Sequence, residues 1–344
     1  MRIANIIVLV TLIISNLFLG GCGSESKLQK NNSLELNGVT VFNKDENLVK
    51  NYIPKEKIHF KELVKESSEY ISIITGDGSV RKTTADIYLS SNSHGVNITY
   101  KDKIISDVVG IYLHDNLYSI RDAFYDAKEY LDSDEKVMVI LLDGFSLNQY
   151  NYAKENNYIE FISKYYKNEA VSVYTPVTNA GFAAIITGEN PNINGVHDRS
   201  FRSMNVDSMF AYALSKKKQA ILLEADIKIL DTEIEPKLHV DSNNDKNIDD
   251  EIFETAKSVA KDEYDLIFVH FHGIDDRGHA YGPQALETMN YIKQIDRYIQ
   301  ELSSIWNGAI ILTADHGMHK FEDGGSHGSC IQEDMLVPYF KKEQ

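Results

Sequence analysis

An unbroken apolar run at 137–142, VMVILL, constrains the fold of this chain more than any other feature. A strand with one face in water alternates apolar and polar residues, whereas a continuous apolar run is typical of a strand buried on both faces. Further apolar runs follow at 170–174, 220–223, 266–270 and 309–313, with a last one near 335–340.

The segments between these runs have helical character, and helices are expected at 148–166, 179–187, 207–217, 249–261 and 284–304. Strands that alternate with helices predict a mostly parallel sheet covered by helices on both faces, that is, the α/β class.

Asp and His residues collect directly after the predicted strands. The residues that follow them are Asp143, Asp275, Asp276, His279, Asp315, His316 and, shortly beyond, His327. In such sheets ligands bind outside the carboxyl ends of the strands, so these side chains are expected at one edge. Carboxylate oxygens and imidazole nitrogens without cysteine suit zinc, and also manganese or iron.

A candidate nucleophile lies in the segment 173–199, VYTPVTNAGFAAIITGENPNINGVHDR. It predicts a break at Pro176 and a helix over 179–187 that ends at Gly188, with Thr178 as the N-cap. A helix N-terminus favours phosphate, but a threonine hydroxyl needs a base or a metal beside it to attack. Taken alone, Thr178 is more simply an N-cap; the surrounding metal-ligand candidates favour the nucleophile.

Together these motifs resemble the alkaline phosphatase superfamily, nearest its nucleotide pyrophosphatase/phosphodiesterase branch. The resemblance covers roughly residues 136–339 through five separated motifs in the family's order, and it implies an alkaline-phosphatase-like fold. It also implies two divalent metal ions, usually zinc. One would be held by Asp143, Asp315, His316 and the Thr178 hydroxyl, and the other by Asp275, His279 and His327.

The resemblance implies a phosphoric ester hydrolase that forms a covalent phospho-threonine on Thr178. The Thr187-Gly188 pair, nine residues after Thr178, identifies the nucleophile, and Asp275 is preferred to Asp276 because it lies four residues before His279. The two ions would serve the attacking and leaving oxygens, and the backbone N–H of Asn179 is a candidate donor to the phosphoryl group.

The position of Arg199 departs from the family pattern. In the diesterase branch an Asn that binds the phosphoryl oxygen lies twenty-one residues after the nucleophile, and here that position holds Arg199. A guanidinium can grip two oxygens, so Arg199 would favour monoesters over diesters. Alternatively, Arg199 pairs with a nearby carboxylate such as Asp198 and points away, or the loop is shifted by one residue.

Other activities and classes are weighed against this hypothesis. Sulfatases and the mutases of the superfamily are disfavoured, because the sulfatase nucleophile motif and room for an inserted domain are missing. A phosphonate hydrolase stays open, since Thr178-Asn179 resembles the start of that branch's nucleophile motif. A non-catalytic, surface-binding lipoprotein also stays open, although no ligand position of the family is lost.

The N-terminal residues 1–21 resemble a bacterial lipoprotein signal peptide. Arg2 precedes an apolar run at 6–18, which ends at Cys22 in the sequence LGGC. Lipidation of Cys22 would anchor an exported protein to the outer face of the cell membrane. It would leave Cys330 without a partner, so no internal disulfide is expected.

The remaining domain predictions follow from composition. Residues 22–33 are a polar tether, 34–131 a small β-rich accessory domain of unknown role, and 132–344 the catalytic domain. With 35 Lys+Arg against 51 Asp+Glu, the formal net charge is −16. This disfavours a nucleic-acid-binding surface, and a small phosphate ester is the expected partner. The oligomeric state stays open.

Overall fold

The computed structural model of the chain describes residues 38–116, 118–261 and 263–344. The predictions for residues 1–21, the tether at 22–33 and Cys22 lie outside these residues. The described residues belong to one compact unit. In the described part of the chain, no helix has both the length and the apolar character needed to cross a membrane.

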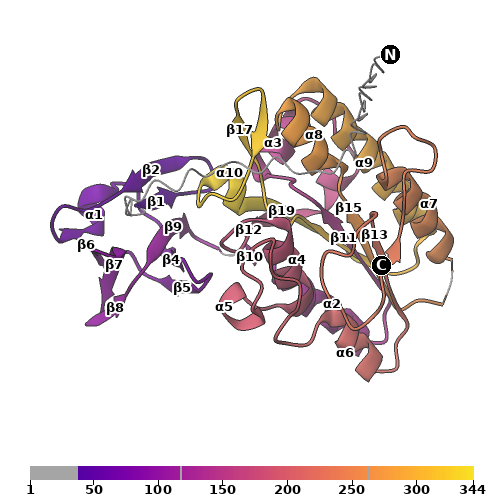
Figure 1. Cartoon of the computed structure of the whole chain (residues 1–344), viewed down its shortest axis with the longest axis horizontal. Helices are drawn as coiled ribbons and strands as arrows, with labels where there is room; N and C mark the ends of the chain where they lie inside the picture. The colour runs from indigo at the N-terminus through magenta and orange to yellow at the C-terminus, as the bar shows by residue number, and fades with distance from the viewer. Residues whose placement is uncertain (1–37, 117, 262) are drawn as a thin grey trace, which may run out of the picture. The chain divides into compact units, whose positions relative to one another are not determined.

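A large mixed sheet forms the centre of the compact unit (Figure 1). In the order in which they lie side by side, its strands in the described residues are β10 (Tyr118–Ser119), β12 (Tyr166–Val171), β19 (Leu336–Lys342), β16 (Ala309–Thr313), β11 (Val137–Leu142), β15 (Leu266–Phe271), β13 (Ala220–Glu224) and β14 (Lys237–Leu238). All neighbouring pairs are parallel except those of β19, which runs antiparallel to both β12 and β16.

Helices cover both faces of this sheet. The side chains of β15 alternate between the faces: Phe268 packs against Phe182 of α4 and Phe210 of α6, while Phe271 packs against Tyr298 of α9. The first face carries α2 (Asp122–Asp132), α4 (Thr178–Thr187) and α6 (Met209–Ser215), and the second carries α3 (Leu147–Glu155), α7 (Asp249–Val259) and α9 (Leu286–Ile305). All six residues of β11 are buried, as its apolar run predicts.

Shorter elements complete this part of the unit. They are η1 (Ile162–Tyr165), α5 (Pro191–Asn194), α8 (Gly273–Tyr281), α10 (Gln332–Met335) and the hairpin of β17 (His319–Phe321) and β18 (Gly324–Ser326). Helix α8 packs against both α9 and β18, which places it beside the carboxyl end of β15.

The N-terminal part of the described chain is a β-rich lobe. One sheet has the order β2 (Asn47–Tyr52), β1 (Val39–Phe42), β9 (Val108–His114), β4 (Tyr70–Thr75) and β5 (Val80–Thr83). The other consists of β3 (Ile58–His59), β6 (Tyr88–Asn92), β7 (Gly95–Tyr100) and β8 (Lys103–Ile105), with the single-turn helix α1 (Phe60–Leu63) beside it. The lobe has its own apolar core between these sheets.

The β-rich lobe also contacts the main core and the segment around α10. Phe42 and Tyr112 pack into the main core rather than into the core of the lobe. The Asn47 side chain accepts a hydrogen bond from the Gln332 backbone at 2.8 Å and donates one to Glu333 at 2.6 Å. The lobe therefore buttresses the stretch of chain that immediately follows His327.

The predicted fold class is confirmed: a mostly parallel sheet with helices on both faces follows a β-rich region. The predicted helix over 148–166 is wrong in its second half. Helix α3 ends at Glu155, and Asn157 adopts a positive φ of 60°, a conformation that asparagine tolerates. The chain then turns through η1, so the next strand is 166–171 rather than 170–174.

The boundary predicted between residues 131 and 132 stays a prediction. In the structure, β10 and α2, which precede it, already belong to the large sheet and its core.

Gly181 determines how closely α4 approaches the loop after β16. A Cβ atom at this position would collide with the backbone of Asp315, which is fixed by the sheet. We expect Gly181→Ala to lower the free energy of unfolding by about 1–3 kcal/mol, the usual cost of overpacking a core. Urea denaturation measures this, with Ser304→Ala on the exposed part of α9 as the control. Equal stabilities of the two variants would contradict the close approach.

Candidate metal centre and active site

The register of the central strands brings acidic and imidazole side chains to one edge of the sheet. Leu141 of β11 pairs with His270 of β15 and with Thr313 of β16, so Asp143 and Asp315 emerge at the same level. Both carboxylates are almost completely buried. Charges in such positions are stabilised only by opposite charges, hydrogen bonds or a metal ion.

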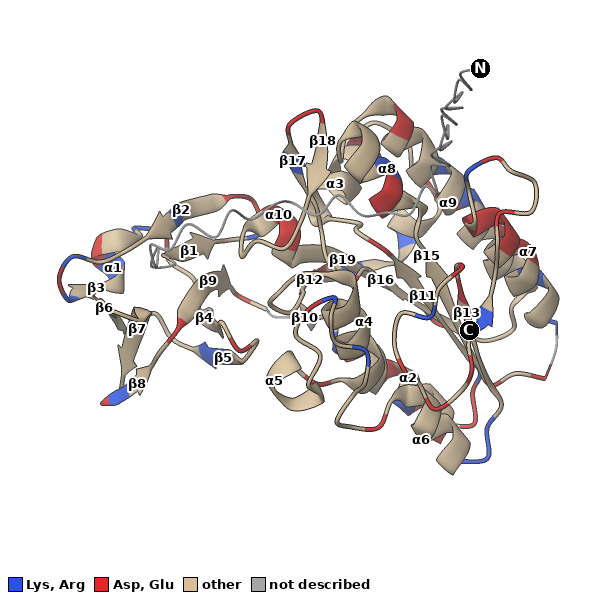
Figure 2. Ribbon diagram, in the orientation of Figure 1, with Lys and Arg blue, Asp and Glu red and all other residues tan. Residues whose placement is uncertain are grey.

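Gly144 lets a further carboxylate join this edge. Its φ of 71° lies in the left-handed region, and a Cβ atom there would collide with Asp275. Asp275 lies in the first turn of α8, where the backbone is held by Asp249 of α7. The Asp249 carboxylate accepts the N–H groups of His272 and Gly273, both at 2.8 Å. Acidic residues lie in the first turns of α7 and α8, and their positions on the ribbon are red in Figure 2.

One group of candidate ligands surrounds His316. Its Nε2 lies 3.3 Å from Asp143 Oδ1, 3.5 Å from Asp315 Oδ2 and 3.4 Å from the Thr178 hydroxyl. These are the four residues that the sequence predicts to hold one metal ion, and the structure brings them together. The other predicted ligands, Asp275, His279 and His327, also offer atoms within 4.8 Å of one another.

The two groups adjoin. Asp143, Asp275 and His316 also offer one atom each within 4.8 Å of one another. His279 Nε2 lies 3.3 Å from Asp275 Oδ2, and His327 Nε2 lies 3.8 Å from Asp275 Oδ1. The spacing of these groups is therefore compatible with two neighbouring ions.

The three histidines of these groups share one orientation. Their Nδ1 atoms lie 2.9 to 3.0 Å from backbone carbonyls, those of Gly317 for His316, Gly325 for His279 and Pro176 for His327. In the neutral tautomer that donates its Nδ1 proton to the carbonyl, the Nε2 atom of each ring has a free lone pair for a metal ion. This is how a backbone carbonyl orients a histidine for metal binding.

The residues fit a pair of divalent cations. Asp143 Oδ1, Asp275 Oδ1 and Asp315 Oδ2 are buried and lack a hydrogen-bond partner. Burying an acceptor without a partner is costly, and a divalent cation would satisfy all three oxygens. Imidazole nitrogen together with carboxylate oxygen is the donor set of zinc, manganese and iron sites.

The burial of this centre shifts its pKa values in opposite directions. Burial and the neighbouring Asp143 carboxylate raise the pKa of Asp315 to about 7. Burial and the neighbouring His316 lower the pKa of the His327 imidazole to about 3, which keeps it neutral. Neutral imidazole is the form that binds metal.

Thr178 is not the N-cap of α4, contrary to the prediction. Val177 takes that place with extended backbone angles (φ −139°, ψ 155°), and Thr178 is the first helical residue. Its hydroxyl is therefore not used to cap the helix and faces His316 instead. The side chain of the next residue, Asn179, donates to the carbonyl of Phe201 at 2.9 Å, which ties α4 to the loop that carries Arg199.

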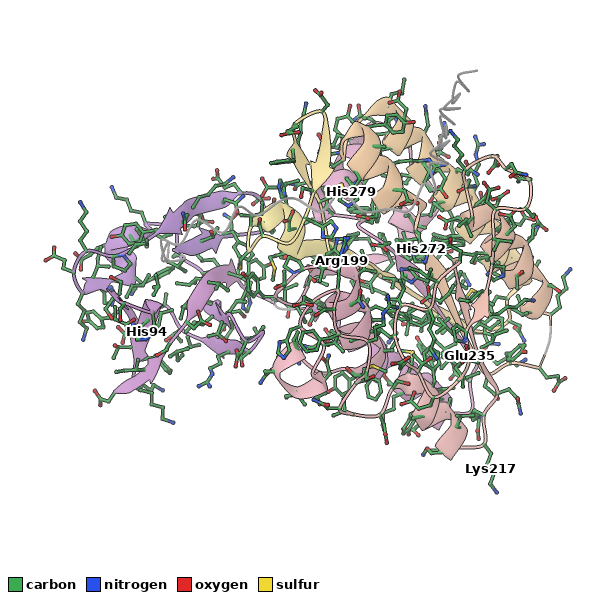
Figure 3. All side chains as sticks on the ribbon, in the orientation of Figure 1. His94, Arg199, Lys217, Glu235, His272 and His279 are labelled. Atoms are coloured by element: carbon green, nitrogen blue, oxygen red, sulfur yellow. The ribbon has the colours of Figure 1, made fainter. Side chains whose placement is uncertain are left out.

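Arg199 points toward the candidate ligands rather than toward Asp198. Its Nη2 lies 2.8 Å from His327 Nε2, whereas Asp198 Oδ1 accepts hydrogen bonds from the backbone and hydroxyl of Ser200. Figure 3 labels Arg199, His279 and His272 in the region of the large sheet. The Arg199 side chain is thus within reach of a group bound between these histidines.

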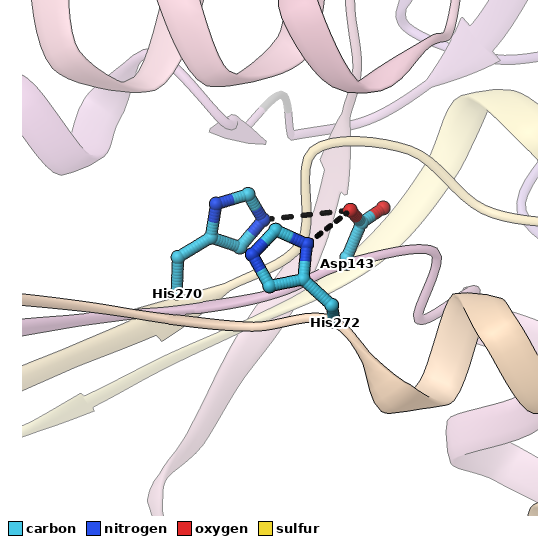
Figure 4. A group of neighbouring side chains, drawn as sticks. All are labelled: Asp143, His270 and His272. Atoms are coloured by element: carbon cyan, nitrogen blue, oxygen red, sulfur yellow. Dashed lines mark ion pairs between the residues drawn. The ribbon is translucent and has the colours of Figure 1, made fainter. Parts of the chain in front are cut away.

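Sequence reasoning missed three residues at this edge. His270 and His272 lie 3.4 Å from Asp143 Oδ2 (Figure 4). Glu224 Oε2 lies 3.2 Å from His270 Nδ1 and 3.3 Å from His272 Nε2. The signal was the His-x-His spacing at the end of a strand, where residues two apart point to the same side.

The comparisons with known proteins bear on the second half of the chain. Residues 223–337 match the model of the type I phosphodiesterase / nucleotide pyrophosphatase family. This phosphodiesterase-type segment contains Asp275, His279, Asp315, His316 and His327. The family resemblance predicted from the motifs is confirmed.

Individual relatives match only in part. The GPI ethanolamine phosphate transferase 1 of Mus musculus is 37% identical over 82 residues, which is 22% of this chain and 8% of that protein. The chain thus spans a small part of the length of the curated relatives that it matches.

The solved structures that are similar to this chain include the following two. Phosphonoacetate hydrolase from Sinorhizobium meliloti 1021 has 17% identity and a TM-score of 0.44, over 54% of this chain and 56% of that one. Murine ectonucleotide pyrophosphatase / phosphodiesterase 5 has 19% identity and a TM-score of 0.42, over 55% and 58%.

Removal of divalent metal is expected to destabilise the protein. Asp143, Asp275 and Asp315 repel one another when no cation compensates their charges, and a ligand that binds the folded state stabilises it. Dialysis against a chelator should therefore lower Tm, and added Zn²⁺ should restore it, as measured by differential scanning calorimetry. Asp315→Asn should show a smaller chelator effect than the unmodified protein. An identical Tm with and without chelator would contradict the metal centre.

Proposed function

We propose that this protein is a metal-dependent phosphoric ester hydrolase in which Thr178 is the nucleophile. The observation that carries the proposal is the position of the Thr178 hydroxyl, at the start of α4 and 3.4 Å from His316 Nε2. It adjoins both groups of candidate metal ligands, and its helix start provides unpaired N–H groups for a phosphoryl group. The family match of residues 223–337 supports the same class of reaction.

The residues of the two groups would hold two divalent cations, most simply Zn²⁺. Such ions polarise an attacking hydroxyl and neutralise a leaving oxygen. Asp143, Asp315 and His316 would hold one ion beside the Thr178 hydroxyl, and Asp275, His279 and His327 would hold the other.

The reaction would proceed in two displacements at phosphorus. The Thr178 oxygen attacks, its proton goes to solvent, and the bond between phosphorus and the leaving oxygen breaks. The leaving oxygen takes a proton from solvent and departs as the alcohol. Water then attacks the phospho-threonine, the bond to Thr178 breaks, and phosphate or a phosphate monoester is released. The backbone N–H of Asn179, in the first turn of α4, would donate a hydrogen bond to a phosphoryl oxygen.

Two neighbouring activities share this chemistry. Phosphonate hydrolysis would use the same nucleophile on a carbon–phosphorus bond. Transfer of the phosphoryl group from Thr178 to an alcohol instead of water is favoured by the similarity to GPI ethanolamine phosphate transferase 1.

The alternative from another class, a non-catalytic lipoprotein, would show no turnover of any phosphate ester. As predicted from the sequence, the substrate is a small phosphate ester, and Cys22 would anchor the exported protein to the outer face of the membrane.

A substrate panel on the full chain tests the proposal. Aryl phosphate, bis-aryl phosphate, nucleotide, phosphonate and sulfate esters are supplied with added Zn²⁺, with and without ethanolamine as an acceptor. Thr178→Ala should lower kcat by at least about 10³-fold, because the covalent route is lost, while the metal content and the circular dichroism spectrum stay unchanged. Thr187→Ala, a buried threonine at the other end of α4, is the control. Retention of most of the turnover in Thr178→Ala would refute the mechanism.

Arg199 is expected to set the preference between monoesters and diesters. A monoester carries more charge on its free oxygens, so a guanidinium near His327 favours it. Arg199→Asn should lower kcat/KM for an aryl monoester by about 10–100-fold and that for a bis-aryl ester by less. Arg202→Asn is a matched control, because the Arg202 side chain donates to backbone carbonyls of the neighbouring loop. Equal losses on both substrates would show that Arg199 does not set the preference.

A further inference from the structure

One stretch of chain connects the two groups of candidate metal ligands. Residues 317–329, called the hairpin segment below, directly follow His316, include His327 and contain β17 and β18 (Figure 1). None of the residues from 319 to 329 is fully buried. A two-stranded hairpin is marginally stable by itself, so the position of His327 depends on contacts that the segment makes with other parts of the chain.

The buried residue Asp334 contacts both ends of the hairpin segment. Its Oδ1 accepts a hydrogen bond from His319 Nδ1 at 2.7 Å, and its Oδ2 accepts one from the Ser329 backbone N–H at 2.9 Å. Its backbone carbonyl accepts a third from the Gly317 N–H at 2.8 Å. Asp334 is 0% exposed, so water does not compete for these contacts, and hydrogen bonds to a carboxylate are stronger than those between neutral groups.

We propose that Asp334 is a positioning residue for metal binding by His316 and His327. At the first end of the segment, the Gly317 carbonyl lies 2.9 Å from His316 Nδ1, so the residue that Asp334 holds is also the residue that orients this imidazole. At the second end, Ser329 lies two residues after His327. Displacement of either end would therefore move a candidate ligand nitrogen. Contacts that orient metal ligands typically change metal affinity about 10–100-fold.

The backbone that carries Asp334 is itself held on two sides. Gln332, in the same turn of α10, is 1% exposed; its side chain donates to the Lys44 carbonyl of the β-rich lobe at 2.9 Å. The Gln332 side chain also accepts a hydrogen bond from Asn148 of α3 at 2.8 Å. Helix α10 leads directly into β19 of the large sheet. Asp334 therefore offers a fixed point to which the more exposed hairpin segment is tied.

This inference rests on the proposed function only through the metal ions that His316 and His327 would hold. It gives Asp334 no contact with the substrate, so Asp334 would affect kcat only through the occupancy and geometry of the metal centre. The role of Asp334 is read from metal affinity, which needs no turnover, whereas the proposed function is read from turnover. The two can therefore fail separately.

Zinc affinity of the full chain tests the role of Asp334. Metal-free protein competes for Zn²⁺ with a chromogenic chelator, and the absorbance change gives the dissociation constant of each variant. Asp334→Ala removes both carboxylate acceptors and should weaken Zn²⁺ binding about 10–100-fold. Asp334→Asn should recover most of the affinity, because an amide oxygen can accept from Ser329 while the amide N–H donates to a neutral His319.

Asp296→Ala is the matched control. Asp296 of α9 is a second buried carboxylate, and it accepts the backbone N–H groups of residues 160–162, which include no candidate ligand. Its loss should lower the Tm of the metal-free protein, as the loss of Asp334 does, but leave Zn²⁺ affinity unchanged. His319→Ala removes one contact of Asp334 at a side chain that is 20% exposed. It should weaken Zn²⁺ binding by less than Asp334→Ala, and it provides the test if Asp334→Ala does not fold.

Limited proteolysis gives a readout that needs no metal. Lys320 lies exposed in the hairpin segment. Trypsin should therefore cut after Lys320 faster in metal-free Asp334→Ala than in metal-free Asp296→Ala, because only the first variant frees the ends of the segment.

Equal Zn²⁺ affinities of the Asp334→Ala and Asp296→Ala variants would overturn the proposal, since Asp334 would then serve stability alone. Unchanged affinity in His319→Ala, or equal cleavage after Lys320 in the two alanine variants, would likewise show that Asp334 does not hold the segment. An Asp334→Asn variant as weak as Asp334→Ala would contradict the hydrogen bonds as its cause.

Discussion

The in-register parallel pairing of β16, β11, β15 and β13 is the constraint on which the rest of the site depends. Parallel strands end at the same level, so Asp143, Asp315 and Glu224 are delivered to one edge of a buried sheet. Their negative charges repel one another at short range in a region with little water. Three features reduce this repulsion between buried carboxylates. They are the surrounding histidines, the backbone carbonyls that orient those histidines, and the bound cations that we propose.

The start of α4 is also arranged so that it lies close to these buried carboxylates. Because Val177 takes the capping position, the first helical residue keeps its hydroxyl for the centre, and Gly181 lets the helix lie against the Asp315 loop. A bulkier residue at Gly144 would displace Asp275, and one at Gly181 would displace Asp315, so either change would move a candidate metal ligand. The close contacts that hold α4 against the large sheet therefore also set the distance between the Thr178 hydroxyl and the candidate metal ligands.

The sequence predicted the fold class and the strands at 137–142 and 309–313, because long apolar runs have few alternatives. It predicted the gathering of Asp143, Asp275, His316 and their partners, because strand ends identify a sheet edge. It missed Glu224, His270 and His272, which look like strand residues until the sheet register places them beside Asp143. The N-cap assignment failed because a one-residue shift in a helix start depends on backbone angles that composition does not encode. Asn157, similarly, ended a helix that periodicity alone would continue.

Strand β19 has a consequence for how the chain comes to be folded. It is the strand that connects the β10–β12 side of the large sheet to β16 and its neighbours, yet it follows every other strand of that sheet in the sequence. During synthesis from the N-terminus, the two sides can form early but cannot join until β19 is inserted between them. His327, a candidate metal ligand, is synthesised only a few residues before β19. Non-local closure of this kind is slow, so completion of the sheet and completion of the metal centre become a single late event.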